Sequence, residues 1–354
     1  MRCGELVIGG FPGTSVPESY LRAMREGRRG GAILFKENVE DGPLQVATVC
    51  RALHDASSGP PPLVCIDQEG GRVARLRAPL LEVPPMRTVA SWGDEALAER
   101  IARLMGDQLA VLGMTVDFAP VLDVNTCATN PVIGDRAFGE EPEACARFGI
   151  AWARGLQRAG LLACGKHFPG HGDTTKDSHI DLPVVEQPRE RLERVELVPF
   201  RAASAAGVAL LMTAHVVYTA LDPGRPGTLS PAVCTALREQ IGFGGVLVSD
   251  DLEMRAIAAR WDVADAAVAA VAAGCDAVLV CWTDALQEQA VAALEREASR
   301  SGAFRARCEQ AHARILEARA RITARPASDA AIQESLEGAE AQALRQELSR
   351  RVAS

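Results

Sequence analysis

Three of the six histidines of this 354-residue chain lie close together, in the segment KHFPGHGDTTKDSH that runs from Lys166 to His179. Two aspartates, Asp173 and Asp177, lie among them. The segment follows LLACG, a short apolar run that predicts a buried strand. Titratable groups placed directly after a buried strand cost desolvation energy and rarely help folding. They therefore indicate a site for chemistry at the end of that strand.

Three interpretations of this cluster compete. The plainest is a loop whose histidines are solvated or hydrogen-bonded and do no chemistry. The second is a metal site, because imidazole and carboxylate groups are zinc ligands; its ligands would be His167, His171, His179 and Asp173. The spacing of the histidines would suit zinc on a helix, but Pro169, Gly170 and Gly172 break any helix there.

The third interpretation is acid/base catalysis by a histidine–aspartate pair. Asp177 lies two residues before His179. At that separation the carboxylate can orient the imidazole ring and raise its pKa, which prepares the ring to donate and accept protons.

A second group of chemical residues lies in GVLVSDDLEM, where an apolar run ends in Asp250 and Asp251. Side chains alternate across a strand, so we expect only one of the two carboxylates to point into a common site. The other, Asp251, is expected to cap a helix that begins at Leu252.

A third group lies in CIDQEGGRVARL, where a strand ends in Asp67 and a Gly-Gly turn leads to Arg72 and Arg75. Arg72 is as easily a structural ion-pair partner as a ligand-binding group. A fourth segment, NPVIGDRAFG, places Arg136 in a loop after another apolar run. His215 ends the run VALLMTAHV and is either a residue of the site floor or a hydrogen-bonded structural histidine.

The segment KHFPGHGDTTKDSH resembles the signature loop of the NagZ-type β-N-acetylglucosaminidases of glycoside hydrolase family 3. The family pattern is K-H-F/I-P-G-H-G, then several variable residues, then D-S/T-H, and every fixed position is present here. The resemblance implies that Asp250, the first aspartate of S-D-D-L, is the nucleophile. It also implies that His179 is the acid/base, with Asp177 holding its tautomer and stabilising the imidazolium.

The same resemblance implies a set of residues that bind sugar hydroxyls. D-Q-E-G-G-R-V-x-R is typical of the family and contributes Asp67 and Arg75, while N-P-x-I-G-x-R-x-F contributes Arg136. Lys166 and His167 end their strand beside the expected sugar.

The elements that must position these residues are short apolar runs that alternate with helix-like segments. Amphipathic stretches at 94–112 and 140–158 have apolar residues at three- and four-residue spacing. Eight buried strands that alternate with helices predict an α/β fold, a single (β/α)8 barrel of the TIM type, with a doubly wound sheet as the alternative. The eight runs are 6–11, 32–38, 63–67, 115–124, 161–168, 208–216, 245–250 and 277–282.

The C-terminal part of the chain is predicted to be helical. We expect a helix over 302–324, and then, from Ser328, one exposed and partly amphipathic helix that packs loosely on the barrel or frays. The predicted organisation is a barrel domain over 1–325 and a helical tail over 326–354.

Composition narrows the classes of function. The net charge of −8 argues against nucleic acid or an anionic membrane surface as a partner. No apolar run reaches the length of a membrane helix. The ten cysteines include no CxxC pair, which indicates reduced thiols and a cytoplasmic location. We expect a monomer with a small sugar substrate, no metal and no cofactor.

The sequence therefore predicts a retaining β-N-acetylhexosaminidase. The resemblance implies N-acetylglucosaminyl-1,6-anhydromuramoyl peptides from cell-wall recycling as its substrates. Phosphorolysis is an alternative, because a neutral His179 repels an incoming phosphate less than a carboxylate does. A metal-dependent barrel hydrolase is another. A catalytically inactive sugar-binding module is disfavoured, because every expected reacting group is present.

The segment from Phe168 to Pro183 has no helix or strand pattern of its own. We expect it to form a lid that carries His179 into place when sugar binds, and to be displaced or poorly ordered without sugar.

Overall fold

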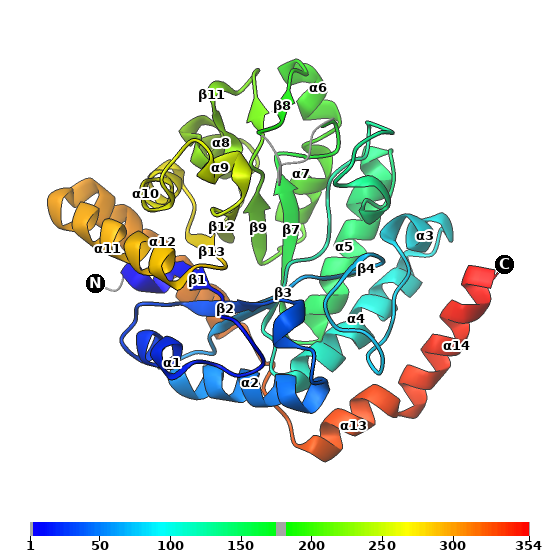
Figure 1. Ribbon diagram of the computed structural model, residues 1–354. Coiled ribbons are helices and arrows are strands. Elements are labelled where there is room, and N and C mark those ends of the chain that lie inside the picture. The colour runs from blue at the N-terminus through cyan, green and yellow to red at the C-terminus, as the bar shows by residue number, and fades with distance from the viewer. Residues whose placement is uncertain (1–2, 175–181, 354) are drawn as a thin grey trace.

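The computed structural model of this chain describes residues 3–174 and 182–353. Its centre is a closed barrel of parallel strands in the order β1-β13-β12-β9-β7-β6-β3-β2 (Figure 1). The barrel strands are β1 (Val7–Gly9), β2 (Gly31–Leu34), β3 (Leu63–Ile66), β6 (Val116–Asp117), β7 (Leu162–Phe168), β9 (Leu210–Thr213), β12 (Val246–Asp251) and β13 (Ala277–Val280). Six of the strands fall within one of the eight apolar runs, and β2 and β12 each extend one residue beyond theirs, so the predicted barrel is confirmed and the doubly wound alternative is wrong.

Helices surround the barrel and cover its outer face (Figure 1). They are α1 (Glu18–Arg25), α2 (Pro43–Ala56), α3 (Met86–Ser91), α4 (Glu95–Leu112), α5 (Pro142–Arg158), α6 (Arg189–Arg194), α7 (Val198–Ala205), α8 (Pro231–Thr235), α9 (Arg255–Ala258), α10 (Val263–Ala273), α11 (Asp284–Arg300), α12 (Gly302–Ala320), α13 (Asp329–Glu337) and α14 (Ala339–Ala353). The predicted helices over 94–112 and 140–158 are α4 and α5. The one predicted over 302–324 is α12, which ends four residues early.

Local sequence fixes the ends of α4. The side chain of Asp94 accepts a hydrogen bond from the backbone N–H of Leu97 at 2.9 Å, which satisfies one of the free donors of the first turn. Gly113 follows the helix with a φ of 96°, a left-handed conformation that glycine adopts without strain. The helix therefore begins and ends where capping chemistry predicts.

Short strands lie outside the barrel, in the connections that follow its strands. They are β4 (Gln68–Gly70) and β5 (Val73–Ala74), which pair with each other, and β8 (Val184–Val185), β10 (Val217–Tyr218) and β11 (Asp222–Pro226), which form a small sheet. Figure 1 shows β8 and β11 at the upper edge of the molecule, near α6.

Two barrel strands, β7 and β12, carry an irregularity near their carboxyl ends. Against β9, Gly165 pairs with Leu211 and Phe168 with Thr213, so three steps on β7 face two on β9. In the pairing of β12 with β13, Val248 lies opposite Ala277 and Asp251 opposite Leu279, so β12 also advances three residues while its partner advances two. An extra residue of this kind is a β-bulge, and it changes the direction of the side chains next to it.

The C-terminal tail differs from the single loose helix that the sequence predicts. It forms two helices, α13 and α14, which run along one side of the barrel beside α4 (Figure 1). The two helices are separated by Gly338, where a Cβ atom would lie only 2.5 Å from the carbonyl oxygen of Glu334. The tail is firmly packed, because its large apolar side chains other than Val352 are buried; these are Ile332, Leu336, Leu344 and Leu348.

In the described part of the chain, no helix has both the length and the apolar character needed to cross a bilayer.

The packed tail should contribute to stability. Leu336→Ala removes a side chain that is 4% exposed, and we expect the free energy of unfolding to fall by about 2–4 kcal/mol because a cavity is left. Urea unfolding followed by circular dichroism measures this change. Val352→Ala is the control: Val352 is 58% exposed in the same tail, and we expect a change within about 0.5 kcal/mol. Equal effects of the two substitutions would show that the tail is loosely attached.

Candidate active site

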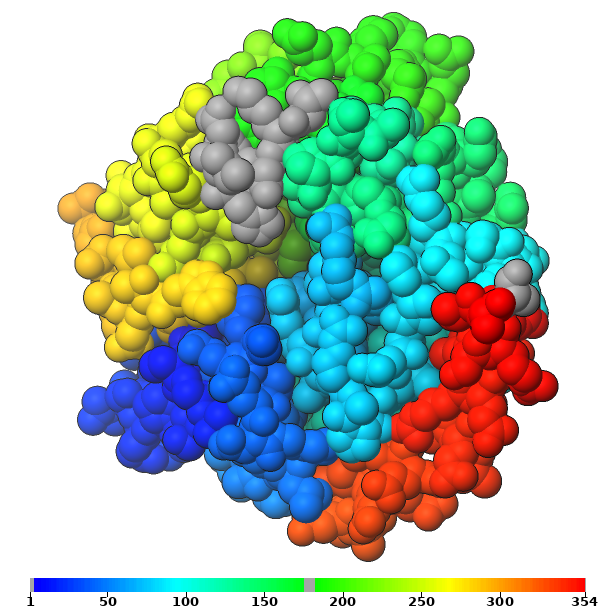
Figure 2. All heavy atoms as spheres, turned by 45° about the vertical axis from the view of Figure 1, so that its right-hand side comes forward, coloured from blue at the N-terminus to red at the C-terminus, as the bar shows by residue number. Residues whose placement is uncertain are grey.

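A cavity of about 560 Å³ opens at the carboxyl ends of the barrel strands. The space-filling view shows a hollow between the cyan segment near residue 75 and the gold segment near residue 280 (Figure 2). Its volume suits a small ligand. Every expected site residue that the structure describes lines it: Asp67, Arg75, Arg136, Lys166, His167 and Asp250.

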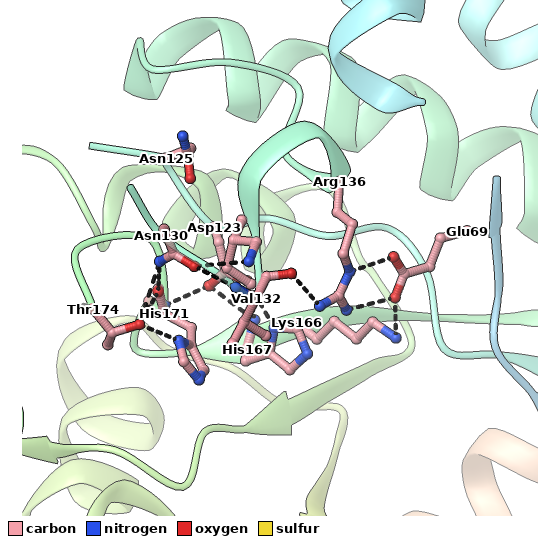
Figure 3. A network of polar contacts seen from close by, with 12 residues as sticks. Glu69, Asp123, Asn125, Asn130, Val132, Arg136, Lys166, His167, His171 and Thr174 are labelled. Atoms are coloured by element: carbon pink, nitrogen blue, oxygen red, sulfur yellow. Dashed lines mark hydrogen bonds and ion pairs between the residues drawn. The ribbon is translucent and has the colours of Figure 1, made fainter. Parts of the chain in front are cut away.

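The floor of the cavity is a network of buried charges centred on Lys166. Its Nζ lies 2.8 Å from Asp67 Oδ1 and 2.6 Å from Glu69 Oε1. Glu69 in turn accepts two hydrogen bonds from Arg136, at 2.9 Å from Nε and 2.8 Å from Nη2 (Figure 3). Arg75 Nη2 lies 2.9 Å from the second oxygen of Asp67. Each charge therefore has at least one opposite partner, as burial requires.

These pairings keep the two carboxylates ionised. Burial alone would raise the pKa of Asp67, but Lys166 and Arg75 hold it well below its usual range. Burial likewise opposes the ionisation of Glu69, yet Arg136 and Lys166 lower its pKa to about 2. The same carboxylates raise the pKa of Lys166 above its usual range, against the effect of burial. The floor thus presents fixed charges at neutral pH.

His167 forms a second histidine–carboxylate pair with Asp123, beside the charged network (Figure 3). Its Nδ1 lies 2.7 Å from Asp123 Oδ2, and the backbone N–H of His171 donates to Asp123 Oδ1 at 2.6 Å. Although burial opposes it, His167 holds the pKa of Asp123 below its usual range. Because Nδ1 is engaged by Asp123, the ring of His167 has a fixed orientation at the edge of the cavity.

The chain after β7 is held by hydrogen bonds as far as Thr174, and residues 175–181 of the expected lid over 168–183 lie outside the described residues. His171 is buried, and its Nδ1 lies 2.8 Å from Thr174 Oγ1. Asn130 donates to the carbonyl oxygen of His171 at 2.9 Å. Gly172 lies so close to the preceding loop that a Cβ atom would be 1.8 Å from the carbonyl oxygen of Val124.

Those of the considered metal ligands that the structure describes have other partners. Asp173 accepts hydrogen bonds from Thr126 Oγ1 at 3.0 Å and from Gln187 Nε2 at 2.8 Å. Burial, with His167 nearby, lowers the pKa of His171 to about 4, so this ring is neutral at pH 7. Within residues 3–174 and 182–353, no three histidine, cysteine or acidic side chains are grouped as a metal site would require.

Asp250 and Asp251 both line the cavity, contrary to the expectation that only one would. The bulge in β12 removes the strict alternation of side chains on which that expectation rested. Asp250 is partly exposed, and its Oδ1 accepts a hydrogen bond from the backbone N–H of Asp251 at 2.8 Å. Its carboxylate is therefore held by the backbone of the strand that carries it.

Asp251 does not cap a helix at Leu252, because the next helix, α9, begins at Arg255. Its Oδ1 instead accepts from the backbone N–H groups of Glu253 at 3.1 Å and Cys281 at 3.2 Å. Burial raises the pKa of Asp251 to about 7. The side chain thus ties the end of β12 to the segment after β13.

His215 and Arg72 serve the structure around the cavity. His215 Nε2 lies 2.8 Å from the carbonyl oxygen of Asp251, and its Nδ1 lies 2.7 Å from Thr228 Oγ1. Of the two alternatives for His215, the structure therefore shows the hydrogen-bonded one, behind the end of β12. Arg72 pairs with Asp135 at 3.2 Å and donates to the carbonyl oxygen of Val132 at 2.5 Å, so it joins two loops at the rim.

Two of the expected catalytic residues, Asp177 and His179, lie outside the described residues. Two residues of the site were not singled out from the sequence, namely Glu69 and Asp123. Glu69 lies two positions after Asp67 in an extended segment, a spacing that places two side chains on one face. Asp123 is a carboxylate near the end of the run 115–124. Both signals were therefore present in the sequence.

The family model, the sequence relatives and the solved structures that this chain resembles all indicate the same family. Residues 16–318 match the family model described as the glycosyl hydrolase family 3 N-terminal domain. A β-hexosaminidase of Thiobacillus denitrificans is 38% identical over 301 residues, covering 83% of each chain. A solved family 3 β-N-acetylglucosaminidase of a Paenibacillus species is 38% identical with a TM-score of 0.89, over 99% of this chain and 68% of that one. NagZ of Neisseria gonorrhoeae, solved with N-trifluoroacetyl-D-glucosamine, is 29% identical with a TM-score of 0.81, over 98% and 97%.

The buried network predicts a pH-dependent stability. Because the pKa of Glu69 falls from about 4.5 to about 2 on folding, its contribution is complete above pH 4.5 and is lost as the pH falls through 2. We expect Glu69→Gln to lower the free energy of unfolding by about 3 kcal/mol at pH 7, and the gap from wild type to close toward pH 2. Denaturant titrations at several pH values measure this gap.

Glu309→Gln is the control for that series, since Glu309 is exposed on α12 and should give a small gap at every pH. A gap for Glu69→Gln that stayed constant from pH 7 to pH 2 would contradict the ionised network.

Proposed function

This chain belongs to glycosyl hydrolase family 3, and we propose that it is a retaining β-N-acetylglucosaminidase with Asp250 as its nucleophile. The chain is a glycosidase of the β-hexosaminidase type, as its family and its relatives indicate. The roles of individual residues and the natural substrate are the content of the proposal.

The observation that carries the proposal is the position of Asp250 in the cavity. Its carboxylate lies at the carboxyl end of β12, where it shares the cavity with the charged network of Lys166 on β7. Charged groups that are already paired and oriented can hydrogen-bond sugar hydroxyls without large rearrangement. We propose that Asp67, Arg75 and Arg136 act in this way, together with Lys166 and His167.

The proposed reaction has two steps. A carboxylate oxygen of Asp250 attacks the anomeric carbon while the bond from that carbon to the leaving oxygen breaks, and the leaving oxygen takes a proton from the acid. The resulting glycosyl-enzyme is opened by water, which loses a proton to the same group acting as base. Two inversions at the anomeric carbon retain its configuration.

We assign the proton transfers to His179, with Asp177 orienting its ring, on the strength of the D-S-H motif. Both residues lie outside the described part of the chain. The turn over 169–174, which precedes this motif in the sequence, carries His171 at the edge of the cavity and supports the assignment.

We propose N-acetylglucosaminyl-1,6-anhydromuramoyl peptides as the natural substrates and the cytoplasm as the location. The relatives that are named β-hexosaminidase and NagZ support the sugar. All ten cysteines are free thiols, which suits a reducing compartment. We further propose that residues 1–325 form the catalytic domain, that the tail over 326–354 is an addition to it, and that the enzyme acts as a monomer.

A panel of nitrophenyl β-glycosides tests the sugar and the nucleophile together. We expect wild type to hydrolyse the N-acetylglucosaminide far faster than the glucoside. Asp250→Asn, a change of nearly equal size, should lower kcat by about three or more orders of magnitude while the thermal unfolding curve is kept, because covalent catalysis is lost. Asp251→Asn is the matched comparison, and a greater loss for that variant would transfer the role of nucleophile to Asp251.

His179→Ala tests the acid/base. We expect large losses on glycosides with a poor leaving group and smaller losses on a nitrophenyl glycoside, which needs little protonation. Azide should then accelerate turnover and yield the glycosyl azide, because it attacks the intermediate without a base. Asp177→Ala should give a milder form of the same pattern.

A uniform loss across leaving groups without azide rescue would show that His179 only binds substrate. The proton donor would then have to be sought elsewhere, and the His167–Asp123 pair would be the first candidate.

A further inference from the structure

The mouth of the cavity carries an exposed aromatic side chain that the proposed reaction does not use. Trp282 follows β13, lines the cavity and is 53% exposed. It is the one aromatic residue among the large apolar side chains exposed in residues 3–174 and 182–353. At the mouth of a cavity, such a side chain offers a large flat apolar surface to a ligand.

The indole ring of Trp282 is held in place from one side. It stacks on the ring of Phe35, with centroids 4.0 Å apart and planes inclined by 25°. Phe35 is itself covered by the guanidinium of Arg75, which lies 5.7 Å from its centroid. Phe35 therefore covers one face of the indole, and the exposed area belongs to the other face and the edges.

Hydrogen bonds also hold the indole ring of Trp282 and the backbone that carries it. Its Nε1 donates to Asp251 Oδ2 at 3.1 Å. The backbone N–H groups of Trp282 and Thr283 both donate to Glu253 Oε1, at 2.8 Å and 3.0 Å. An aromatic ring with fixed position and one open face binds a flat apolar ligand surface at little cost in conformational entropy.

Exposure along the cavity indicates which part of a substrate would meet this ring. Lys166 and Arg136 at the centre of the floor are nearly buried, at 3% and 11% exposure. Arg75 nearer the mouth is 29% exposed, whereas Trp282 is half exposed. The sugar whose glycosidic bond is broken must place its anomeric carbon at Asp250, among the charged groups. The portion of the substrate at the mouth is the leaving group.

We propose that Trp282, backed by Phe35, stacks against the C–H face of a pyranose ring in the leaving group. The inference rests on the proposed function, since it names the part of the same substrate that this residue selects. Trp282 thus makes the enzyme prefer glycosides whose leaving group is itself a sugar over those with a small leaving group.

The test compares two N-acetyl-β-glucosaminides, one with N-acetylglucosamine and one with trifluoroethanol as leaving group. We expect Trp282→Ala to lower kcat/KM for the disaccharide about tenfold and to lower it much less for the trifluoroethyl glycoside. Trp282→Phe keeps an aromatic face and should retain most of the activity on the disaccharide. Leu44→Ala removes another exposed apolar side chain, which lies on α2 and does not line the cavity, and should change neither rate.

Three outcomes would overturn the inference. Equal losses on both substrates would mean that Trp282 contacts the N-acetylglucosamine ring that both substrates share, or that it acts only through Asp251. A loss for Trp282→Phe as large as that for Trp282→Ala would mean that the indole N–H matters and the ring face does not. No loss on either substrate would show that the ring does not contact ligand. Failure of wild type on both glycosides would instead refute the proposed function.

Discussion

Burial of the Lys166 ammonium group is the constraint on which the rest of the site depends. Removing an ion from water costs several kcal/mol, and here the cost is offset by two carboxylates at 2.8 Å and 2.6 Å. Asp67 and Glu69 come from the connection after β3, and Arg136, which pairs with Glu69, comes from the one after β6. Three separate segments are therefore held together by charge, and none of them can be displaced without leaving an unpaired ion in the interior.

Much of this arrangement could be predicted from the sequence, because its causes are local. The barrel strands are mostly apolar up to their carboxyl ends, as strands buried on both faces must be. The carboxyl ends of parallel strands meet at one end of a barrel, so polar residues at those ends converge whatever their distance in the chain. This rule is sufficient to bring together the side chains of Asp67, Arg136, Lys166 and Asp250.

The features that could not be predicted arise from contacts between distant segments. Periodicity does not reveal a bulge, so the shared position of Asp250 and Asp251 was missed. The first turn of α9 begins at Arg255, since Asp251 is occupied with backbone groups of Glu253 and Cys281. The tail is divided at Gly338 into two helices, and the first of them, α13, packs against α4. In each case a tertiary contact overrides a valid local preference.

The bulges in β7 and β12 have a consequence for how such an enzyme can diverge. Below them the strands pair regularly, with Cys164 opposite Leu210 and Val246 opposite the same residue. Above them the side chains of Lys166, His167 and Asp250, which we propose to contact substrate, lie outside the regular hydrogen-bond register. Substitutions at the mouth that lie outside the charged network can therefore change specificity while the regular strand pairing below is kept. Ligand binding and barrel closure depend on different lengths of the same strands.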